Sequence, residues 1–327
     1  MKSDTAKTGC ERDPPMKILV VGAGATGGFF GGRLIEAGAD VTFLVRAGRA
    51  AQLAAQGLRL VTPKGEIRLT PRTVTAESLT EVYDLVIIAV KAYGLISAMQ
   101  DFAPAIGPDT VILPLLNGLG HVEVLQSRFG ETKVFGGVCA IVAFLAPDGA
   151  VVQGADLATL THGELDGGVT PRAAAVQATL ANPGFGASLS SDIRQDLWNK
   201  WVMLASLAAT TCLMRAPIGE IEAAPGGRVF LLGTLSEAAA VAASSGHPCS
   251  DAWLERVRTI LTTKGSSMTA SMYRDMQSGA PVEVEAILGD LVRRAEALGV
   301  PTPRLAAART ALEVYSARRK APTEVTA

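Results

Sequence analysis

Short apolar runs alternate with helical patterns over the first half of the chain. The runs at residues 17–21, 83–90 and 110–115 are almost continuously apolar, which is typical of parallel strands buried on both faces, and 40–46 predicts a further strand. Helical patterns lie between them at 25–37 and 95–102. Strands that alternate with helices predict βαβ units around a parallel sheet. Further strand signals lie at 134–145 and 150–161, 173–180 has a helical pattern, and 187–191 crosses to the second half.

A hairpin and a run of helices complete the pattern. Residues 58–61 and 66–69, joined by Thr-Pro-Lys-Gly, predict a β-hairpin extension. The second half predicts helices at 195–214, 226–245, 250–264, 282–298 and 304–316. Residues 201–214 carry no charge but are too short to cross a bilayer, so they indicate a buried core helix.

The fold class is therefore α/β, with a Rossmann-type dinucleotide-binding domain followed by an all-helical domain. We place the first domain at residues 16–190 and the helical domain at 191–318. Residues 1–15 are polar and predict a disordered extension, and residues 319–327 predict a solvated tail.

A glycine-rich loop directly follows the first strand. The loop is Gly22-Ala23-Gly24-Ala25-Thr26-Gly27 and opens the first helix. In a βαβ unit the first glycine makes the tight turn, the second lets the backbone approach a pyrophosphate, and the third lets helix and strand pack closely. The alternative is an ordinary glycine-rich turn, because the 34 glycines of the chain produce accidental matches. The strand before the loop and the helix after it favour a dinucleotide site.

The end of the second strand indicates which dinucleotide binds. NAD sites usually carry an acidic residue there for the ribose hydroxyls, whereas this chain has Arg46 and then Arg49. Guanidinium groups suit a 2′-phosphate. NADP(H) is therefore the predicted cofactor, and a plain solvated strand end is the alternative.

Composition excludes several classes of partner. The 327 residues are 48% hydrophobic and 19% charged, with 30 basic and 31 acidic residues and a net charge of −1. This balance favours neither a nucleic-acid nor a membrane partner. The four cysteines form no C-x-x-C pair, and the first fifteen residues lack the apolar core of a signal peptide. We expect a cytoplasmic protein without a metal site.

Three polar side chains are candidates for catalysis or binding. Lys91 and Asn117 follow apolar strands, at the edge where open α/β sheets bind ligands; for Asn117 the alternative is a turn former before Gly118. Lys200 heads an apolar helix between tryptophans. Partial burial would favour its neutral amine and suit a general acid that protonates a carbonyl oxygen. The alternative is a lysine that extends to the surface.

A set of ordered motifs resembles the ketopantoate reductase (2-dehydropantoate 2-reductase) family. The motifs, across residues 16–318, are GAGATGG, VTFLVR, VKAY, LNGLG, LWNKW, RAPIGEI and ASMYRDMQSGAPVEVEAILG. The resemblance implies NADPH-dependent reduction of a 2-oxo acid to a 2-hydroxy acid, in a cleft between the two domains. It also implies a place in pantothenate biosynthesis.

The resemblance assigns roles by motif position. Lys200 matches the catalytic proton donor, and Glu283 matches the glutamate that orients the lysine and the substrate hydroxyl. Asn117 matches the asparagine beside nicotinamide and substrate, and Ser271 matches a serine for the substrate carboxylate. Lys91 matches a cofactor-side lysine, and Arg46 falls where the family contacts the 2′-phosphate. Glu283 could instead be an exposed helix residue, and Ser267 competes with Ser271 for its role.

One departure concerns the substrate. The family typically has asparagines four and eight residues after the lysine, where this chain has Leu204 and Ala208. Those positions share the lysine's helix face, so the reaction class is predicted more firmly than ketopantoate itself. A more apolar 2-oxo acid is a competing hypothesis. Another two-domain NAD(P)-dependent hydroxyacid dehydrogenase and a non-catalytic NADP(H)-binding protein remain alternatives, and a homodimer is the expected assembly.

Overall fold

A five-stranded parallel sheet forms the first half of the protein. The structure, a computed structural model, describes residues 15–181 and 183–320, so the extension predicted for residues 1–15 lies almost wholly outside the described residues. The strand order is β5-β2-β1-β6-β7, with every neighbouring pair parallel. The strands are β1 (Lys17–Val21), β2 (Asp40–Leu44), β5 (Arg72–Val74), β6 (Tyr83–Ile88) and β7 (Ile106–Pro114). The predicted Rossmann-type sheet is confirmed.

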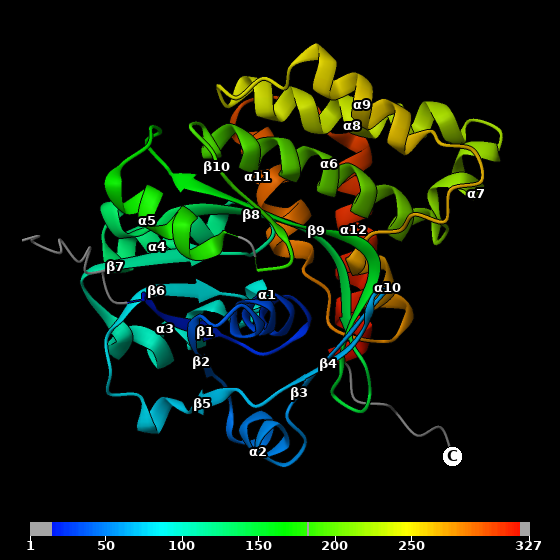
Figure 1. Cartoon of the computed structure of the whole chain (residues 1–327). Coiled ribbons are helices and arrows are strands. Elements are labelled where there is room, and N and C mark those ends of the chain that lie inside the picture. Colours follow the sequence, from blue (N-terminus) through cyan, green and yellow to red (C-terminus); the bar gives the residue numbers. More distant parts are fainter. Residues whose placement is uncertain (1–14, 182, 321–327) are drawn as a thin grey trace, which may run out of the picture.

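A second sheet lies beside the parallel one (Figure 1). It contains β3 (Leu58–Thr62), β4 (Gly65–Leu69), β8 (Phe135–Leu145), β9 (Val151–Glu164) and β10 (Gly186–Leu189). The expected hairpin is β3 and β4, but β3 also pairs in parallel with β9, through Leu60 and Val151. β8 pairs antiparallel with β9. The hairpin is therefore part of a sheet that the sequence pattern did not separate from the first.

Helix α1 (Ala25–Glu36) packs between the two sheets, which explains its glycines. A Cβ on Gly31 would lie 2.6 Å from Phe43 of β2. On the other side, a Cβ on Gly28 would lie 2.7 Å from Val151 of β9. Larger side chains at these positions would push the helix away from one sheet or the other.

The remaining helices of this half cover the sheets. They are α2 (Ala47–Gln56), α3 (Leu95–Phe102), α4 (Gly120–Phe129) and α5 (Pro171–Leu180). The sequence pattern did not predict α2 or α4. Leu53 is the buried residue of α2, and such a small apolar face gives little periodic signal.

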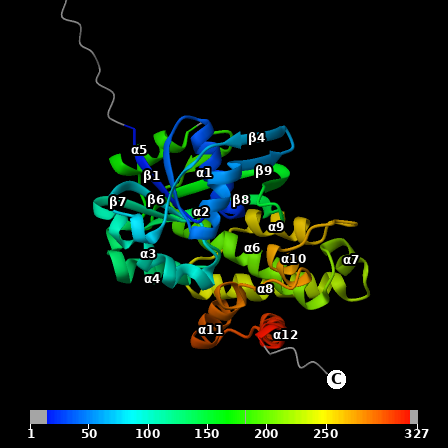
Figure 2. The same ribbon diagram turned by 90° about the horizontal axis from the view of Figure 1, so that it is seen from below.

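A bundle around α6 forms the second half. Its helices are α6 (Ile193–Met214), α7 (Ile218–Ala223), α8 (Gly227–Ser244), α9 (Asp251–Leu261), α10 (Ser271–Gln277), α11 (Asp290–Ala297) and α12 (Pro303–Lys320). Helix α6 contacts α7, α8, α10 and α12, and Figure 2 shows it at the centre of the group. The predicted all-helical part is confirmed. Every helix in the described part of the chain is too short or too polar to span a bilayer.

Two helix boundaries differ from the sequence prediction. The helix expected to begin at Val282 begins after Glu283 in the structure. It opens with a π-helical turn, Glu285–Gly289, and continues as α11. Helix α12 runs to Lys320 instead of ending at Ser316, so Arg319, which was expected to begin the tail, is helical. The boundary at 190/191 stays a prediction; β10 ends at Leu189 and α6 begins at Ile193.

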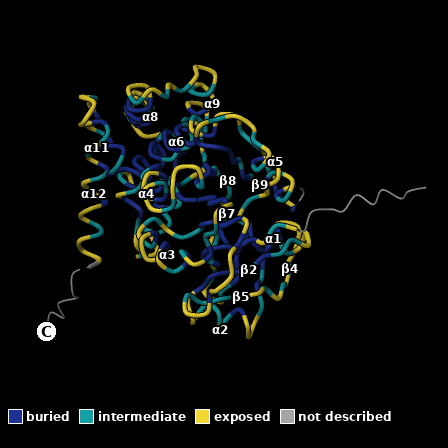
Figure 3. The backbone as a smooth tube through the Cα atoms, turned by 90° about the vertical axis from the view of Figure 1, so that its left-hand side faces the viewer, coloured by how far each residue is buried: buried dark blue, intermediate teal, exposed yellow. Residues whose placement is uncertain are grey.

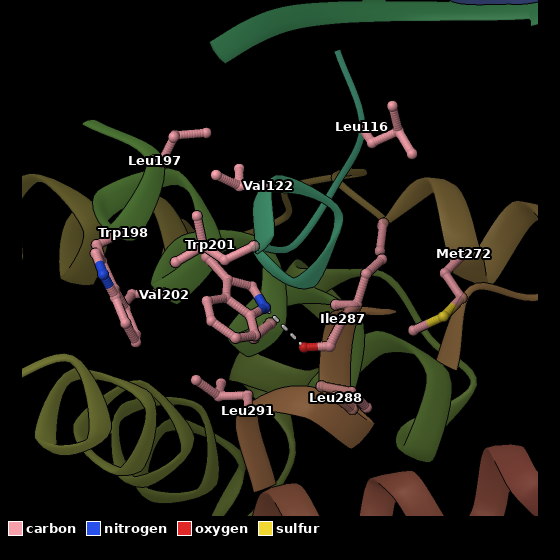
Figure 4. Packing of buried hydrophobic residues seen from close by; sticks show 14 of the residues in the cluster. Leu116, Val122, Leu197, Trp198, Trp201, Val202, Met272, Ile287, Leu288 and Leu291 are labelled. Carbon is pink, nitrogen blue, oxygen red and sulfur yellow. Dashed lines mark hydrogen bonds between the residues drawn. The ribbon is translucent and has the colours of Figure 1, made fainter. Parts of the chain in front are cut away.

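The apolar core continues from the parallel sheet into the bundle. One cluster joins residues of the sheet, such as Leu19 and Ile112, with Trp201 of α6 and Ile287 of the π-helical turn. Figure 3 shows the buried backbone running through β7 and β8 to α6 and α8. Within this cluster the Trp201 indole N–H donates a 2.9 Å hydrogen bond to the Ile287 carbonyl (Figure 4). The head of α6 is thus fixed against the start of the last helical segment.

Candidate active site

The glycine loop has the backbone geometry that its motif requires. Gly22 adopts a φ of +96°, a region that favours glycine. A Cβ on Gly27 would overlap the Gly22 carbonyl oxygen. Gly24, the N-cap of α1, has no atom within 4 Å of the place where a Cβ would stand. The first and third glycines are thus fixed by the protein's own packing, whereas the second leaves open space beside the free N–H groups of the helix.

The two arginines after β2 have different surroundings. Arg46 is exposed and caps the start of α2. Arg49 is partly buried; its Nε donates to the Ala23 carbonyl at 3.1 Å, and its Nη1 donates to the Gly149 carbonyl at 3.1 Å. Arg49 therefore holds the glycine loop against the β8–β9 turn. Contact of Arg46 with a 2′-phosphate stays a prediction, whereas Arg49 already bonds to the carbonyls of Ala23 and Gly149.

Lys91 connects the end of β6 to the helical half. Its ammonium lies 2.8 Å from Asp275 Oδ2 on α10 and 3.2 Å from Glu283 Oε2. Burial, the largest single influence, opposes the charge, but the two carboxylates outweigh it and raise the pKa of Lys91. The other Glu283 oxygen accepts a 2.9 Å bond from the Ala92 backbone N–H. Glu283 is only 6% exposed, so it is not the exposed helix residue that was the alternative.

Lys200 reaches the carboxyl end of β7 from α6. Its Nζ lies 3.8 Å from Cys139 Sγ on β8, and that thiol lies 3.8 Å from the Leu115 carbonyl just before Asn117. The structure brings Lys200 to this strand end but gives Glu283 other partners. The expectation that Glu283 orients Lys200 is therefore not met by a direct contact.

Asn117 and Ser271 complete the set of sequence-predicted residues. Asn117 is half-buried after β7 and, with His121 and Glu283, borders a cavity of about 730 Å³. Ser271 is the first residue of α10, also half-buried, and lies one helical turn before Asp275. Helix α10 contacts α6 near the C-terminal end of that helix, where Ala270 meets Thr211, whereas Lys200 lies near its N-terminal end. Ser267, its rival, precedes α10 in an irregular segment.

Sequence reasoning missed three side chains at this edge. Asp275 lies within the quoted YRDMQSG motif, and its helical spacing from Ser271 was the available signal. His121 follows Asn117 in NGLGH and is 6% exposed. Burial, together with the charge of Lys200, lowers the His121 pKa to about 3. Cys139 had only its apolar surroundings as a signal.

Among the described residues, no group of acidic, histidine or cysteine side chains could hold a metal ion.

Comparison with known proteins matches both halves of the chain to models of one family. The sequence model described as ketopantoate reductase PanE/ApbA matches residues 18–167, and the model of the C-terminal part of the same family matches residues 192–316. The matches cover the glycine loop, Lys91 and Asn117 in the first half, and Lys200, Ser271 and Glu283 in the second.

Individual relatives agree with the family models. The chain is 36% identical over 304 residues to the uncharacterized oxidoreductase YkpB of Bacillus subtilis (strain 168), covering 93% of this chain and 100% of that protein. It is 30% identical over 293 residues to a 2-dehydropantoate 2-reductase of Halobacterium salinarum, covering 88% and 95%.

A solved structure shows the same fold. A D-mandelate dehydrogenase, solved as a ternary structure with NADH and anilino(oxo)acetate, superposes with a TM-score of 0.83 at 23% identity over 94% of this chain and 100% of that chain. On the two matched domains and the curated relatives, this chain belongs to the ketopantoate reductase family of NAD(P)-dependent oxidoreductases that act on CH–OH groups.

Proposed function

We propose that this protein uses NADPH to reduce a 2-oxo acid to the 2-hydroxy acid, with Lys200 as the general acid. The observation that carries the proposal is the position of Lys200. From the helical half, its ammonium reaches the carboxyl end of β7, through Cys139 and Leu115, at the strand edge that also carries the glycine loop. Ligands of open α/β sheets bind at this edge.

The residues of the loop fit a dinucleotide. Gly24 leaves room for a phosphate beside the N-terminus of α1, and Arg46 is exposed at the end of the next strand. Arg46 in place of a carboxylate is the basis for proposing NADPH over NADH. When bound, NADPH supplies the hydride to C2 of the substrate. Gly22 to Gly27, Arg46, Lys91 and Asn117 are the residues proposed to hold the cofactor.

The chain's own groups supply the proton and the orientation. Lys200 donates a proton to the C2 oxygen as that oxygen gains negative charge, so hydride and proton together convert C=O to CH–OH. Asn117 positions the reacting groups beside the strand end, and Ser271 binds the carboxylate. Glu283 is proposed to act on the substrate hydroxyl through the cluster that it forms with Lys91.

The helix face beside Lys200 supports a substrate more apolar than ketopantoate. Leu204 is half-buried one turn after the lysine, and Ala208 is fully buried one turn further. Neither offers a hydrogen bond to a substrate hydroxyl, and an unpaired hydroxyl in a closed site is costly. We therefore propose a 2-oxo acid with a larger apolar side chain, with 2-dehydropantoate as the reference substrate.

A panel of substrates tests the proposal. Steady-state rates are measured with ketopantoate and with 2-oxo acids of increasing apolar side-chain size, each with NADPH and with NADH. The proposal expects a higher kcat/KM for NADPH and for an apolar side chain. Ketopantoate as the clear best substrate would refute the substrate shift, and a preference for NADH would refute the role of Arg46.

Substitution of the lysine tests the mechanism. Lys200→Ala is expected to lower kcat by at least about 100-fold, which is typical of losing a general acid, while NADPH affinity measured by fluorescence titration is kept. Lys264→Ala, at an exposed lysine after α9, is the matched control and should leave both values unchanged. Unchanged turnover in Lys200→Ala would show that another group donates the proton.

A further inference from the structure

His121 is a buried polar side chain whose hydrogen-bonding groups are unused. It lies in the first turn of α4, four positions after Asn117, and is 6% exposed. Within residues 15–181 and 183–320, neither ring nitrogen has a hydrogen-bond partner. A neutral imidazole has one donor and one acceptor nitrogen. Leaving buried groups of this kind unpaired is costly, which indicates that His121 serves another group at the site.

The Lys200 ammonium lacks a strong hydrogen-bond acceptor among the described side chains. An ammonium has three donors and needs acceptors, yet the hydrogen bond that the described residues offer it is to Cys139 Sγ, at 3.8 Å. A thiol is a weak acceptor. The next two turns of the same helix face carry Leu204 and Ala208, which have no polar side-chain atoms. The proposed proton donor therefore lacks a firm side-chain partner on its own helix.

Residues at the start of α4 and at the head of α6, which carries Lys200, border one cavity. Leu119 and Val122, which flank His121, border a small cavity of about 160 Å³ together with Leu197 and Trp198 of α6. Figure 4 shows Val122 beside Leu197 and Trp201, the residue after Lys200. The positive charge of Lys200 is also close enough to contribute to the lowered His121 pKa, after burial as the larger cause. The segment that carries His121 thus lies beside the segment that carries Lys200, although the two side chains make no direct hydrogen bond in the described residues.

We propose that His121 is a positioning residue for Lys200. In its neutral form, one ring nitrogen accepts a hydrogen bond from a water that in turn accepts one from the Lys200 ammonium. These bonds hold the ammonium toward the substrate oxygen. The inference rests on the proposed role of Lys200 in the reaction and deepens it, because it names what keeps the proton donor in place at a site whose helix face is apolar.

A purely structural histidine would behave in the opposite way. If His121 only filled space, its replacement would lower stability and leave the catalytic rate of the folded protein unchanged. If it orients Lys200, His121→Leu removes unpaired polar atoms from the core, so stability at neutral pH is kept or increased, while catalysis declines. The two roles therefore predict opposite changes in melting temperature and in kcat.

Kinetics of two variants tests the inference. His121→Leu is expected to lower kcat by at least about tenfold, the loss of one hydrogen bond to a charged group, with KM for the 2-oxo acid changed less than kcat. His121→Gln retains an acceptor oxygen and should restore most of the rate. A kcat for His121→Leu within about twofold of the parent protein, or a loss in His121→Gln equal to that in His121→Leu, would overturn the inference.

A double substitution separates this inference from the proposed function. In a Lys200→Ala background, His121→Leu should have no further effect on turnover, because the two residues act as one unit. A full additional loss would contradict the coupling, and unchanged turnover in Lys200→Ala alone would instead reject the lysine's role. Without cofactor, nitrogen NMR of the His121 ring should show the acceptor nitrogen shifting when Lys200 is replaced by methionine. An unchanged ring signal would mean that the two side chains do not interact.

Discussion

The glycine loop and the lysine cluster lie at the same edge of the parallel sheet but are built in different ways. The loop uses contiguous residues, and its shape depends on backbone geometry: a positive φ at Gly22 and contact between Gly27 and the Gly22 carbonyl. The cluster joins Lys91 to Asp275 and Glu283, across more than half of the chain, through side-chain contacts. A contiguous motif carries its own geometry, whereas a cluster of distant residues exists only when both halves have folded together.

The two regions also differ in electrostatics. The loop contains no titratable side chain, so its geometry should be insensitive to pH. The cluster contains a lysine whose pKa is raised, and the nearby His121 has a pKa lowered to about 3. Steric substitutions should therefore break the loop, and changes of charge or pH should affect the cluster.

The largest effect is expected in the loop. Gly27→Val places a branched side chain against the Gly22 carbonyl and should lower the free energy of unfolding by about 3 kcal/mol while abolishing NADPH binding. Gly24→Ala is the matched control, because open space surrounds that position. It should keep stability and weaken NADPH by roughly tenfold, since the second glycine of the motif admits the pyrophosphate. Urea unfolding and fluorescence titration measure both; equal stability loss in the two variants would contradict the assigned roles of the glycines.

A smaller effect is expected from the contact between the two halves. Glu283→Ala leaves the partly buried Ala92 N–H without its acceptor and removes one of the two carboxylates at Lys91. We expect it to lower the free energy of unfolding by about 2 kcal/mol. Glu283→Gln can still accept from Ala92, and Asp275 still pairs with Lys91, so it should cost under about 1 kcal/mol. If the two variants are equally destabilised in urea unfolding, charge rather than the Ala92 bond holds this contact.

The smallest effect concerns pH. The ordinary His pKa is 6.5, and that of folded His121 is about 3. Below pH 6.5 the unfolded chain therefore binds a proton that the folded protein refuses, and stability falls as pH falls. Between pH 7 and pH 5.5 this group should reduce the free energy of unfolding by about 1.3 kcal/mol. Urea unfolding of the parent protein and of His121→Leu at both pH values measures the difference. Identical pH dependence in the two proteins would show that folding does not lower the His121 pKa.

Sequence reasoning predicted the parallel sheet because its strands are buried on both faces and therefore almost uniformly apolar. It missed α2, whose alanines and glutamines bury only Leu53 in the core. It identified strands at 134–145 and 150–161 but not their sheet, because pairing of β9 with β3 joins segments far apart in the sequence. Short-range patterns give the element type, and tertiary pairing decides the partner.

The same limit applies to the site. Lys91, Asn117 and Glu283 lie near one edge of the sheet, yet the partner expected for Glu283 was Lys200 and the partner found is Lys91. A position in a motif identifies the residue, but it does not show which of two lysines the carboxylate of that residue contacts. Asp275 and His121 were missed for a related reason. Their neighbours come from other elements, so burial and pairing became visible only in three dimensions.

The π-helical turn at Glu285–Gly289 lies between Glu283, which pairs with Lys91, and Leu291, which packs in the core. A π-helical turn accommodates one residue more than an α-helical turn. Deleting one residue from it would therefore leave an ordinary α-helical turn, with Glu283 and Leu291 facing nearly as they do now. Deleting one residue from a regular turn of α11 would instead rotate everything before it by about 100° relative to everything after it. The π-helical turn thus tolerates a one-residue deletion that in α11 would disconnect the two halves of the site, even where every side chain of the motif is retained.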